Sequence, residues 1–276
     1  MADRLGLSVV TESGGGLRGS VDFEVIPLKG VASRVLALPV GSTVTVTASP
    51  SMGIEATIDL VVELMAGGFK AVPHLSARLV ADRRALAAIV KRLDAAGVTH
   101  VFVVGGDGPP RGSYQDAGSL LADLAENGHP FLEVGIAGYP ESHPLISDER
   151  LLQALFEKTP HATYLVSQMC FSAGTIIDWV VRIRGEGVTL PVKVGVPGAV
   201  DPVRLVSVAS RIGVGESIRF LAKNRSVLRI LRPGPYRPGR LIRELERLDS
   251  GLGLTGLHFY TFNQVEATAS WFRGAV

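Results

Sequence analysis

Polar side chains follow several apolar segments of this sequence, and these residues are the ones that could do chemistry. Glu24 lies inside an apolar segment that Pro27 closes. A carboxylate there costs free energy unless it is paired, protonated or used. Other apolar segments lead into polar residues that suit acid–base work or the binding of a polar ligand: Thr47, His74, Asp107, Tyr139 with His143, Gln168 and, after the last segment, Asn263.

Each of these residues also has a purely structural interpretation. Glu24 fits the polar face of an edge strand, and His74 fits a satisfied buried histidine. Asp107 fits a turn between glycines, Tyr139 a strand terminator, and Gln168 an amide bonded to backbone. For one such residue alone we favour structure. Several of them at equivalent strand ends favour function, because packing does not require a polar group at each end.

The segments that carry these residues alternate between strand-like and helix-like patterns. Short runs rich in Val and Ile predict eight strands: residues 21–26, 43–47, 70–75, 100–104, 131–136, 163–167, 192–196 and 257–261. Helical periodicity and capping residues predict the intervening helices: residues 54–65, 82–96, 116–126, 147–158, 175–184, a helix capped by Asp201, 216–223, 237–248 and 267–272.

Apolar strands separated by helices are typical of a parallel sheet that is covered on both faces. We therefore expect an α/β protein and, with eight such strands, a (β/α)8 TIM barrel. An open, doubly wound sheet is the alternative. Residues 29–42 are few for a crossover helix, so we expect the first βα connection to be shortened. In a barrel the active site forms at the C-terminal ends of the strands, where the polar residues would meet.

Composition narrows the class of protein. The chain has 276 residues, 46% of them hydrophobic and 20% charged, which is enough apolar material for one large core. We expect a flexible glycine-rich lead-in over residues 1–19 and a single barrel domain over residues 20–276. One cysteine, Cys170, excludes an internal disulfide framework. With no signal-peptide pattern and no apolar run long enough to span a bilayer, we expect a soluble cytoplasmic protein.

Other binding chemistries receive little support from the sequence. The glycines around Asp107 lack the spacing of a dinucleotide-binding or P-loop motif. The histidines and aspartates show no metal-ligand spacing, so we expect no metal. The formal net charge of +2 does not indicate a nucleic-acid partner. The one basic stretch, residues 225–247, is interrupted by Glu244 and Glu246 and is typical of a solvated helix.

The residues at the strand ends, taken in order, resemble the methylenetetrahydrofolate reductase family. The resemblance extends over nearly the whole chain after residue 20. It rests on residues 23–27 (FEVIP), 73–75 (PHL), 106–110 (GDGPP), 139–144 (YPESHP), 167–168 (SQ) and 258–263 (HFYTFN). The fourth of these is the most specific motif, and the last matches the family's closing strand almost letter for letter.

The resemblance implies a flavin-containing barrel that carries FAD and uses NADH or NADPH. The hydride would pass through the flavin to 5,10-methylenetetrahydrofolate, giving 5-methyltetrahydrofolate. Glu24 and Asp107 would be catalytic, with Glu24 as the general acid that protonates the bridging nitrogen. Glu24, Gln168 and Phe171 would bind the folate. The flavin would be bound by Thr47, His74, Gly106, Asp107, Tyr114, Tyr139, His143 and Lys158. Family members also assemble through barrel helices, which implies a homo-oligomer.

Three departures from the family pattern keep alternatives open. Gly105 stands where the family has an arginine that contacts the flavin diphosphate, the segment after Gln168 differs, and the first connection is short. A flavin-independent folate reductase of the same family is one alternative. A non-catalytic folate-binding or partner barrel is another, and a third is a related enzyme that oxidises methyltetrahydrofolate in a demethylation pathway.

Overall fold

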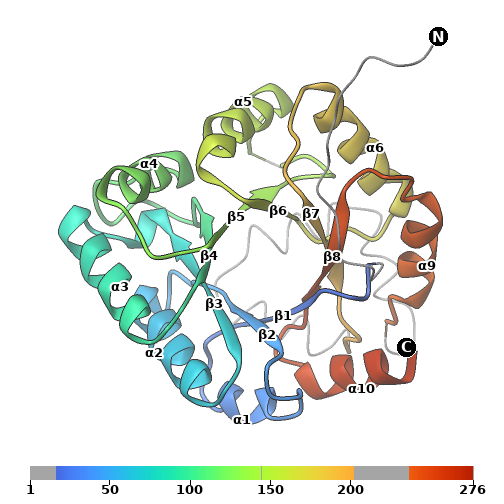
Figure 1. Cartoon of the computed structure of the whole chain (residues 1–276), viewed down its shortest axis with the longest axis horizontal. Helices are drawn as coiled ribbons and strands as arrows, with labels where there is room; N and C mark the ends of the chain where they lie inside the picture. The colour runs from blue at the N-terminus through green and yellow to red at the C-terminus, as the bar shows by residue number, and fades with distance from the viewer. Residues whose placement is uncertain (1–16, 144, 202–235, 276) are drawn as a thin grey trace.

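The eight predicted strands form a closed parallel barrel. The computed structural model describes residues 17–143, 145–201 and 236–275. Neighbouring strands pair in sequence order, and the last strand returns to the first (Figure 1). The strands are β1 (Val21–Val25), β2 (Thr43–Val46), β3 (Lys70–Ser76), β4 (His100–Val104), β5 (Glu133–Gly138), β6 (Tyr164–Ser167), β7 (Val192–Pro197) and β8 (Leu254–Tyr260). The predicted TIM barrel is therefore confirmed.

Helices surround the barrel as an outer ring (Figure 1). They are α1 (Val31–Val35), α2 (Gly53–Ala66), α3 (Arg83–Ala95), α4 (Ala117–Asn127), α5 (Asp148–Lys158), α6 (Ala173–Gly185), α9 (Gly239–Leu248) and α10 (Val265–Ala275), with short 3-10 turns at Ala77–Leu79 and Thr159–His161. The side chains of Asp82, Asp116 and Ser147 each accept a hydrogen bond from a first-turn amide, which explains why α3, α4 and α5 begin where they do. The helices predicted after Asp201 and over residues 216–223 lie outside the described residues.

The first connection is short, as predicted. Its helix, α1, has five residues and follows Gly30, whose φ of 79° is readily adopted only by glycine. Arg34 of this helix donates a hydrogen bond of 3.0 Å to the carbonyl oxygen of Asn263, which lies just beyond β8. The shortened unit is thus tied directly to the end of the last strand.

Two strands begin two or more residues away from the predicted start, while the other strands begin within one residue of it. β5 begins at Glu133, since the side chain of Leu132 is exposed. β8 begins at Leu254. The prediction began at residue 257 because the glycines before that point are typical of a loop. At Gly256 a β-carbon would lie 2.5 Å from the backbone oxygen of Ser20. The glycine therefore lets the chain entering β1 approach β8 closely, and strand pairing continues past it.

The apolar core lies between the strands and the helices. Phe23 of β1 stacks on Phe259 of β8 with ring centroids 5.8 Å apart, and Phe272 of α10 packs edge-on against both rings. Leu17 is also buried in this core, so packing begins before the domain boundary expected at residue 20. Residues 1–16 of the expected lead-in lie outside the described part of the chain. No helix in the described ranges is long and apolar enough to cross a membrane.

Candidate active site

Glu24 occupies the C-terminal half of β1, as predicted, and its surroundings fix its position. It is in register with Thr45 of β2 on one side and with Tyr260 of β8 on the other. The hydroxyl of Thr261 donates a hydrogen bond of 2.6 Å to the backbone oxygen of Glu24. Two residues further on, the Asn263 amide bonds both the N–H and the C=O of Ile26, at 2.8 and 2.9 Å. The end of β1 is therefore clamped to the end of β8.

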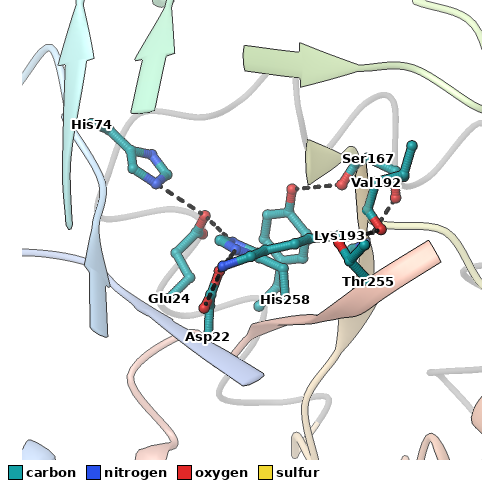
Figure 2. A network of polar contacts seen from close by, with 10 residues as sticks. Asp22, Glu24, His74, Ser167, Val192, Lys193, Thr255 and His258 are labelled. Carbon is teal, nitrogen blue, oxygen red and sulfur yellow. Dashed lines mark hydrogen bonds and ion pairs between the residues drawn. The ribbon is translucent and has the colours of Figure 1, made fainter. Parts of the chain in front are cut away.

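The side chain of Glu24 lies between two histidines (Figure 2). Its Oε2 is 3.1 Å from Nε2 of His258 on β8 and 3.9 Å from Nε2 of His74 on β3. Both imidazole rings are buried, whereas 14% of the Glu24 side chain remains exposed. The carboxylate is thus the member of this group that a bound molecule could reach, and its setting is more polar than the apolar strand end we expected.

The surroundings of the two histidines shift their pKa values in opposite directions. Burial favours the neutral form of His258, but contacts with Asp22 and Glu24 outweigh it and raise the pKa of His258 to about 9. Burial lowers the pKa of His74 to about 4, despite the nearby Glu24 carboxylate. At neutral pH, His258 is therefore an imidazolium and His74 a neutral ring. His74 Nε2 has no hydrogen-bond partner among the described residues, so the ring is not the satisfied histidine of the structural interpretation.

A partly buried ion pair lies one layer deeper in the barrel. Lys193 of β7 places its ammonium 3.0 and 2.8 Å from the two carboxylate oxygens of Asp22. Burial disfavours a charged Asp22, yet its contacts with His258 and Lys193 lower the pKa of the carboxyl group overall. Figure 2 shows Asp22 beside both Lys193 and His258. The interior of the barrel is therefore charged where most barrel interiors are apolar.

The ends of β5 and β6 carry the second group of predicted residues. Tyr139 packs edge-on against His143, with ring centroids 5.5 Å apart. Lys158 donates a 3.4 Å hydrogen bond to the backbone oxygen of Ala137, and burial lowers the pKa of its ammonium to about 8. The Gln168 side-chain oxygen accepts a hydrogen bond of 2.9 Å from the amide of Met169, which agrees with the structural interpretation of that residue.

Asp107 lies exposed in the loop after β4. Gly106 before it has a φ of 89°, and a β-carbon there would lie 1.9 Å from the Ser76 hydroxyl oxygen, so only glycine fits. Arg78 holds the loop, donating hydrogen bonds of 3.2 Å to the backbone oxygens of Gly106 and Gly108. The loop is thus anchored to the 3-10 turn that follows β3, and Gly105 places no side chain in it.

Three predicted residues remain, and one of them, Thr47, donates a backbone hydrogen bond of 2.9 Å to the carbonyl oxygen of Val25 on β1. Thr47 is half-buried just after β2. The hydroxyl of Tyr114 donates a 2.7 Å hydrogen bond to Asp123 of α4, so this ring belongs to the helix layer. Phe171 packs edge-on against Tyr236 with centroids 5.4 Å apart, beside a cavity of about 500 Å³. Among the described residues, no three His, Cys, Asp or Glu side chains are arranged to hold a metal ion.

Asp22 and Lys193 were missed by sequence reasoning, and His258 was recognised only as part of a motif. A signal for Asp22 was present, because residues two apart on a strand share a face and Glu24 was already a candidate. Lys193 is likewise a single charge in an apolar strand. Neither strand pattern indicates that these side chains meet inside the barrel.

The structure defines a (β/α)8-barrel protein with ionisable groups at its strand ends, and comparison with known proteins defines the family. The chain belongs to the methylenetetrahydrofolate reductase family, whose sequence pattern matches residues 29–212. Methylenetetrahydrofolate reductase 2 of Saccharomyces cerevisiae is 25% identical over 114 residues, covering 37% of this chain and 19% of the yeast protein. Methylenetetrahydrofolate reductase 1 of Schizosaccharomyces pombe is 28% identical over 136 residues, covering 49% and 23%.

The chain thus aligns with about a fifth of the length of these curated relatives. Among solved structures, the spore cortex-lytic enzyme SleL of Bacillus megaterium QM B1551 superposes with a TM-score of 0.50. The superposition covers 96% of this chain and 75% of SleL, at 11% identity. At this identity the likeness concerns the barrel fold alone.

Proposed function

We propose that this protein reduces 5,10-methylenetetrahydrofolate to 5-methyltetrahydrofolate with NADH or NADPH as the hydride source. The observation that carries the proposal is the position of Glu24. It is a partly exposed carboxylate at the C-terminal end of a barrel strand, in hydrogen-bond contact with a charged histidine. Family membership supports the substrate, while Glu24 itself lies outside the matched residues 29–212.

Glu24 would act as the general acid. A proton placed on the bridging nitrogen of the folate breaks the bond from that nitrogen to the methylene carbon and leaves an iminium ion. Addition of a hydride to the same carbon then completes the methyl group. Glu24 is suited to the proton transfer because Thr261 and Asn263 fix its strand and the neighbouring rings shield it from bulk water.

The described residues fit an FAD, although Gly105 lacks the expected arginine. Lys158 has a half-buried ammonium with one hydrogen bond, to a backbone oxygen, and no carboxylate within ion-pair distance among the described residues. A half-buried cation that forms no ion pair with a described residue suits an anion such as a diphosphate. The flavin, when bound, would relay the hydride. Thr47, His74, Gly106, Tyr139 and His143 are proposed to line its site, and Tyr114 to support it from the helix layer.

The folate would contact the other strand ends. Phe171 offers an aromatic wall beside the cavity, and Gln168 an amide at the end of β6. Asp107 is exposed, and Arg78 holds the backbone of its loop through a hydrogen bond. This position suits a carboxylate that contacts a ligand after the ligand binds. We also propose that the protein acts as an assembly of identical chains, as family members do.

The test is a spectrum followed by an assay. The purified protein is examined in visible light with and without added FAD, and then supplied with methylenetetrahydrofolate and NADH or NADPH. A flavin spectrum and formation of methyltetrahydrofolate support the proposal. Reduction of the folate by a colourless protein that binds no FAD would instead establish the flavin-independent reductase, which Gly105 favours. Absence of turnover with both nucleotides, with and without FAD, would contradict the proposal.

A further inference from the structure

Four ionisable side chains form a line through the interior of the barrel, and the proposed reaction uses only the last of them. The line runs from Lys193 through Asp22 and His258 to Glu24 (Figure 2). The two bases and two acids alternate, so their charges cancel when all four are ionised. Burial of such groups is costly unless each is matched, which makes the arrangement a specific feature of this chain.

The geometry gives each nitrogen of His258 its own carboxylate. Nε2 is at hydrogen-bond distance, 3.1 Å, from Oε2 of Glu24, whereas Nδ1 is at ion-pair distance, 3.8 Å, from Oδ2 of Asp22 and has no hydrogen-bond partner among the described residues. Only a doubly protonated imidazole can present an N–H to both. The side chain of His258 is 1% exposed, so water does not compete for these contacts.

Other ionisable groups around this ring do not alter the pairing. The His74 ring lies 6.4 Å away, centroid to centroid, and is neutral at pH 7, while the Tyr260 ring lies 5.0 Å away. Burial raises the pKa of Tyr260 well above its ordinary value, so this phenol is also uncharged. Lys193 holds Asp22 from the other side and packs over the Tyr164 ring at 5.1 Å. The proton on His258 therefore faces two anions.

We propose that His258 and Asp22 are positioning residues that store the proton which Glu24 delivers. The inference rests on the proposed function and extends it. Before reaction, the pair of Glu24 and His258 holds one proton on the ring. The ring first passes its Nε2 proton to Oε2 of Glu24, and the carboxyl group then passes that proton to the folate nitrogen. The ring is then neutral and Glu24 remains an anion. One proton from solvent, entering through the exposed edge of Glu24, restores the pair after product leaves.

A role in packing alone does not explain the arrangement. The opposite faces of the same strands are packed with Phe23 and Phe259, so these strands accept large apolar side chains. Asp22 already has a complete partner in Lys193, with both carboxylate oxygens bonded. The added feature is the ring that connects this ion pair to Glu24.

His258→Gln tests the proposal, because glutamine can hydrogen-bond Glu24 but cannot store a proton. We expect kcat for folate reduction to fall about 10²-fold. We also expect the alkaline limb of the kcat profile to move to lower pH, since it lies near the His258 pKa of about 9 in the native protein. The KM for the folate should change little. His161→Gln, the same substitution at the opposite end of the barrel, should leave rate and profile unchanged.

A second variant guards against misfolding. Asp22→Asn combined with Lys193→Gln removes one charge of each sign and leaves His258 and Glu24 in place. Without the Asp22 anion, the alkaline limb should move in the same direction as in His258→Gln, but by less. A wild-type profile in both variants would overturn the proposal.

Histidine NMR separates this inference from the proposed function. One of the six histidines should keep its proton to about pH 9, and its signal should be absent in His258→Gln. If the wild-type protein turns over no folate while this signal is present, the proposed function fails and the proton store stands as a property of the barrel. Titration of His258 at about pH 6.5 would overturn the inference, whether or not the protein reduces folate.

Discussion

The two faces of the same barrel strands differ sharply in chemistry. On β1, Phe23 and Val25 face the helices and are buried in the apolar layer, while Asp22 and Glu24 face the interior. On β8, Phe259 packs outward, whereas His258 points inward between the two carboxylates. One face thus buries area that stabilises the fold, and the other places ionisable groups within reach of one another. Substitutions on the inner face should therefore mainly change the rate of folate reduction, and those on the outer face should mainly change the free energy of unfolding.

The largest effect is expected at Glu24. Glu24→Gln keeps the shape of the side chain but removes its acid–base function, so folate reduction should fall by about 10²–10⁴-fold. Oxidation of the nicotinamide with another electron acceptor should persist, since that reaction needs no proton on the folate. Steady-state rates for the two acceptors measure this split. Equal loss of both activities would mean that Glu24 supports the fold rather than the chemistry.

Glu133→Gln is the matched control for that substitution. Glu133 opens β5 at the opposite end of the barrel, 3.3 Å from His100. Its side chain is 45% exposed, so the pair contributes little to stability. The same chemical change at this position should leave both reactions unaltered.

On the outer face, a substitution should lower the stability of the fold rather than the rate of the reaction. Phe259 is fully buried and contacts Phe23, Trp271 and Phe272. Phe259→Ala should lower the free energy of unfolding by about 3–5 kcal/mol, because it removes buried area and leaves a cavity. The rate per folded molecule should change far less. Urea unfolding and active-site titration measure the two quantities, and a large loss of rate without loss of stability would contradict the division between the faces.

His74 makes the inner face sensitive to acid. Its pKa is about 4 in the native protein, below the value near 6.5 of an unfolded chain, so the native ring resists protonation. The stability that follows is present above about pH 6.5 and is lost as the pH falls toward 4. Between pH 7 and 4.5, wild-type protein should lose about 2–3 kcal/mol more than His74→Gln. Urea midpoints at both pH values measure the difference, and equal losses would mean that the buried ring accepts a proton without cost.

Much of this organisation could be predicted from the sequence, and the limit has a physical cause. Strand order and the polar strand ends follow from local patterns, and Glu24 stands out as a charge in an apolar run. Parallel barrel strands are buried on both faces, however, so hydrophobicity does not reveal which face is the interior. Asp22 and Lys193 are 171 residues apart, and only the closed register brings them together. A pattern within one strand does not contain that information.

Loops limited the prediction in a different way. Tyr114 follows the β4 loop closely enough in sequence to suggest the site, yet its ring turns into the helix layer and bonds Asp123. The long segment between β4 and α4 allows either placement, and the choice is made by the buried space beside α4. By contrast, Tyr139 directly follows the last residue of β5, so its side chain is held near the strand end. Proximity to a strand end therefore decided which predicted residues the structure brought together.

The smallest effect in this series is expected where the two faces meet, at Asn263. Its amide bonds the N–H and C=O of Ile26, and its φ of 59° lies in a region that asparagine tolerates better than most residues. Asn263→Ala leaves two buried backbone groups of Ile26 without partners and should cost about 1–3 kcal/mol. It also frees the end of β1, so kcat should fall along with stability. Glu24→Gln, by contrast, should lower mainly the rate, and Phe259→Ala mainly the stability. Asn263→Asp keeps the acceptor for the Ile26 N–H and should recover part of both losses. If Asn263→Ala lowers stability but leaves kcat unchanged, the clamp holds the fold without positioning Glu24.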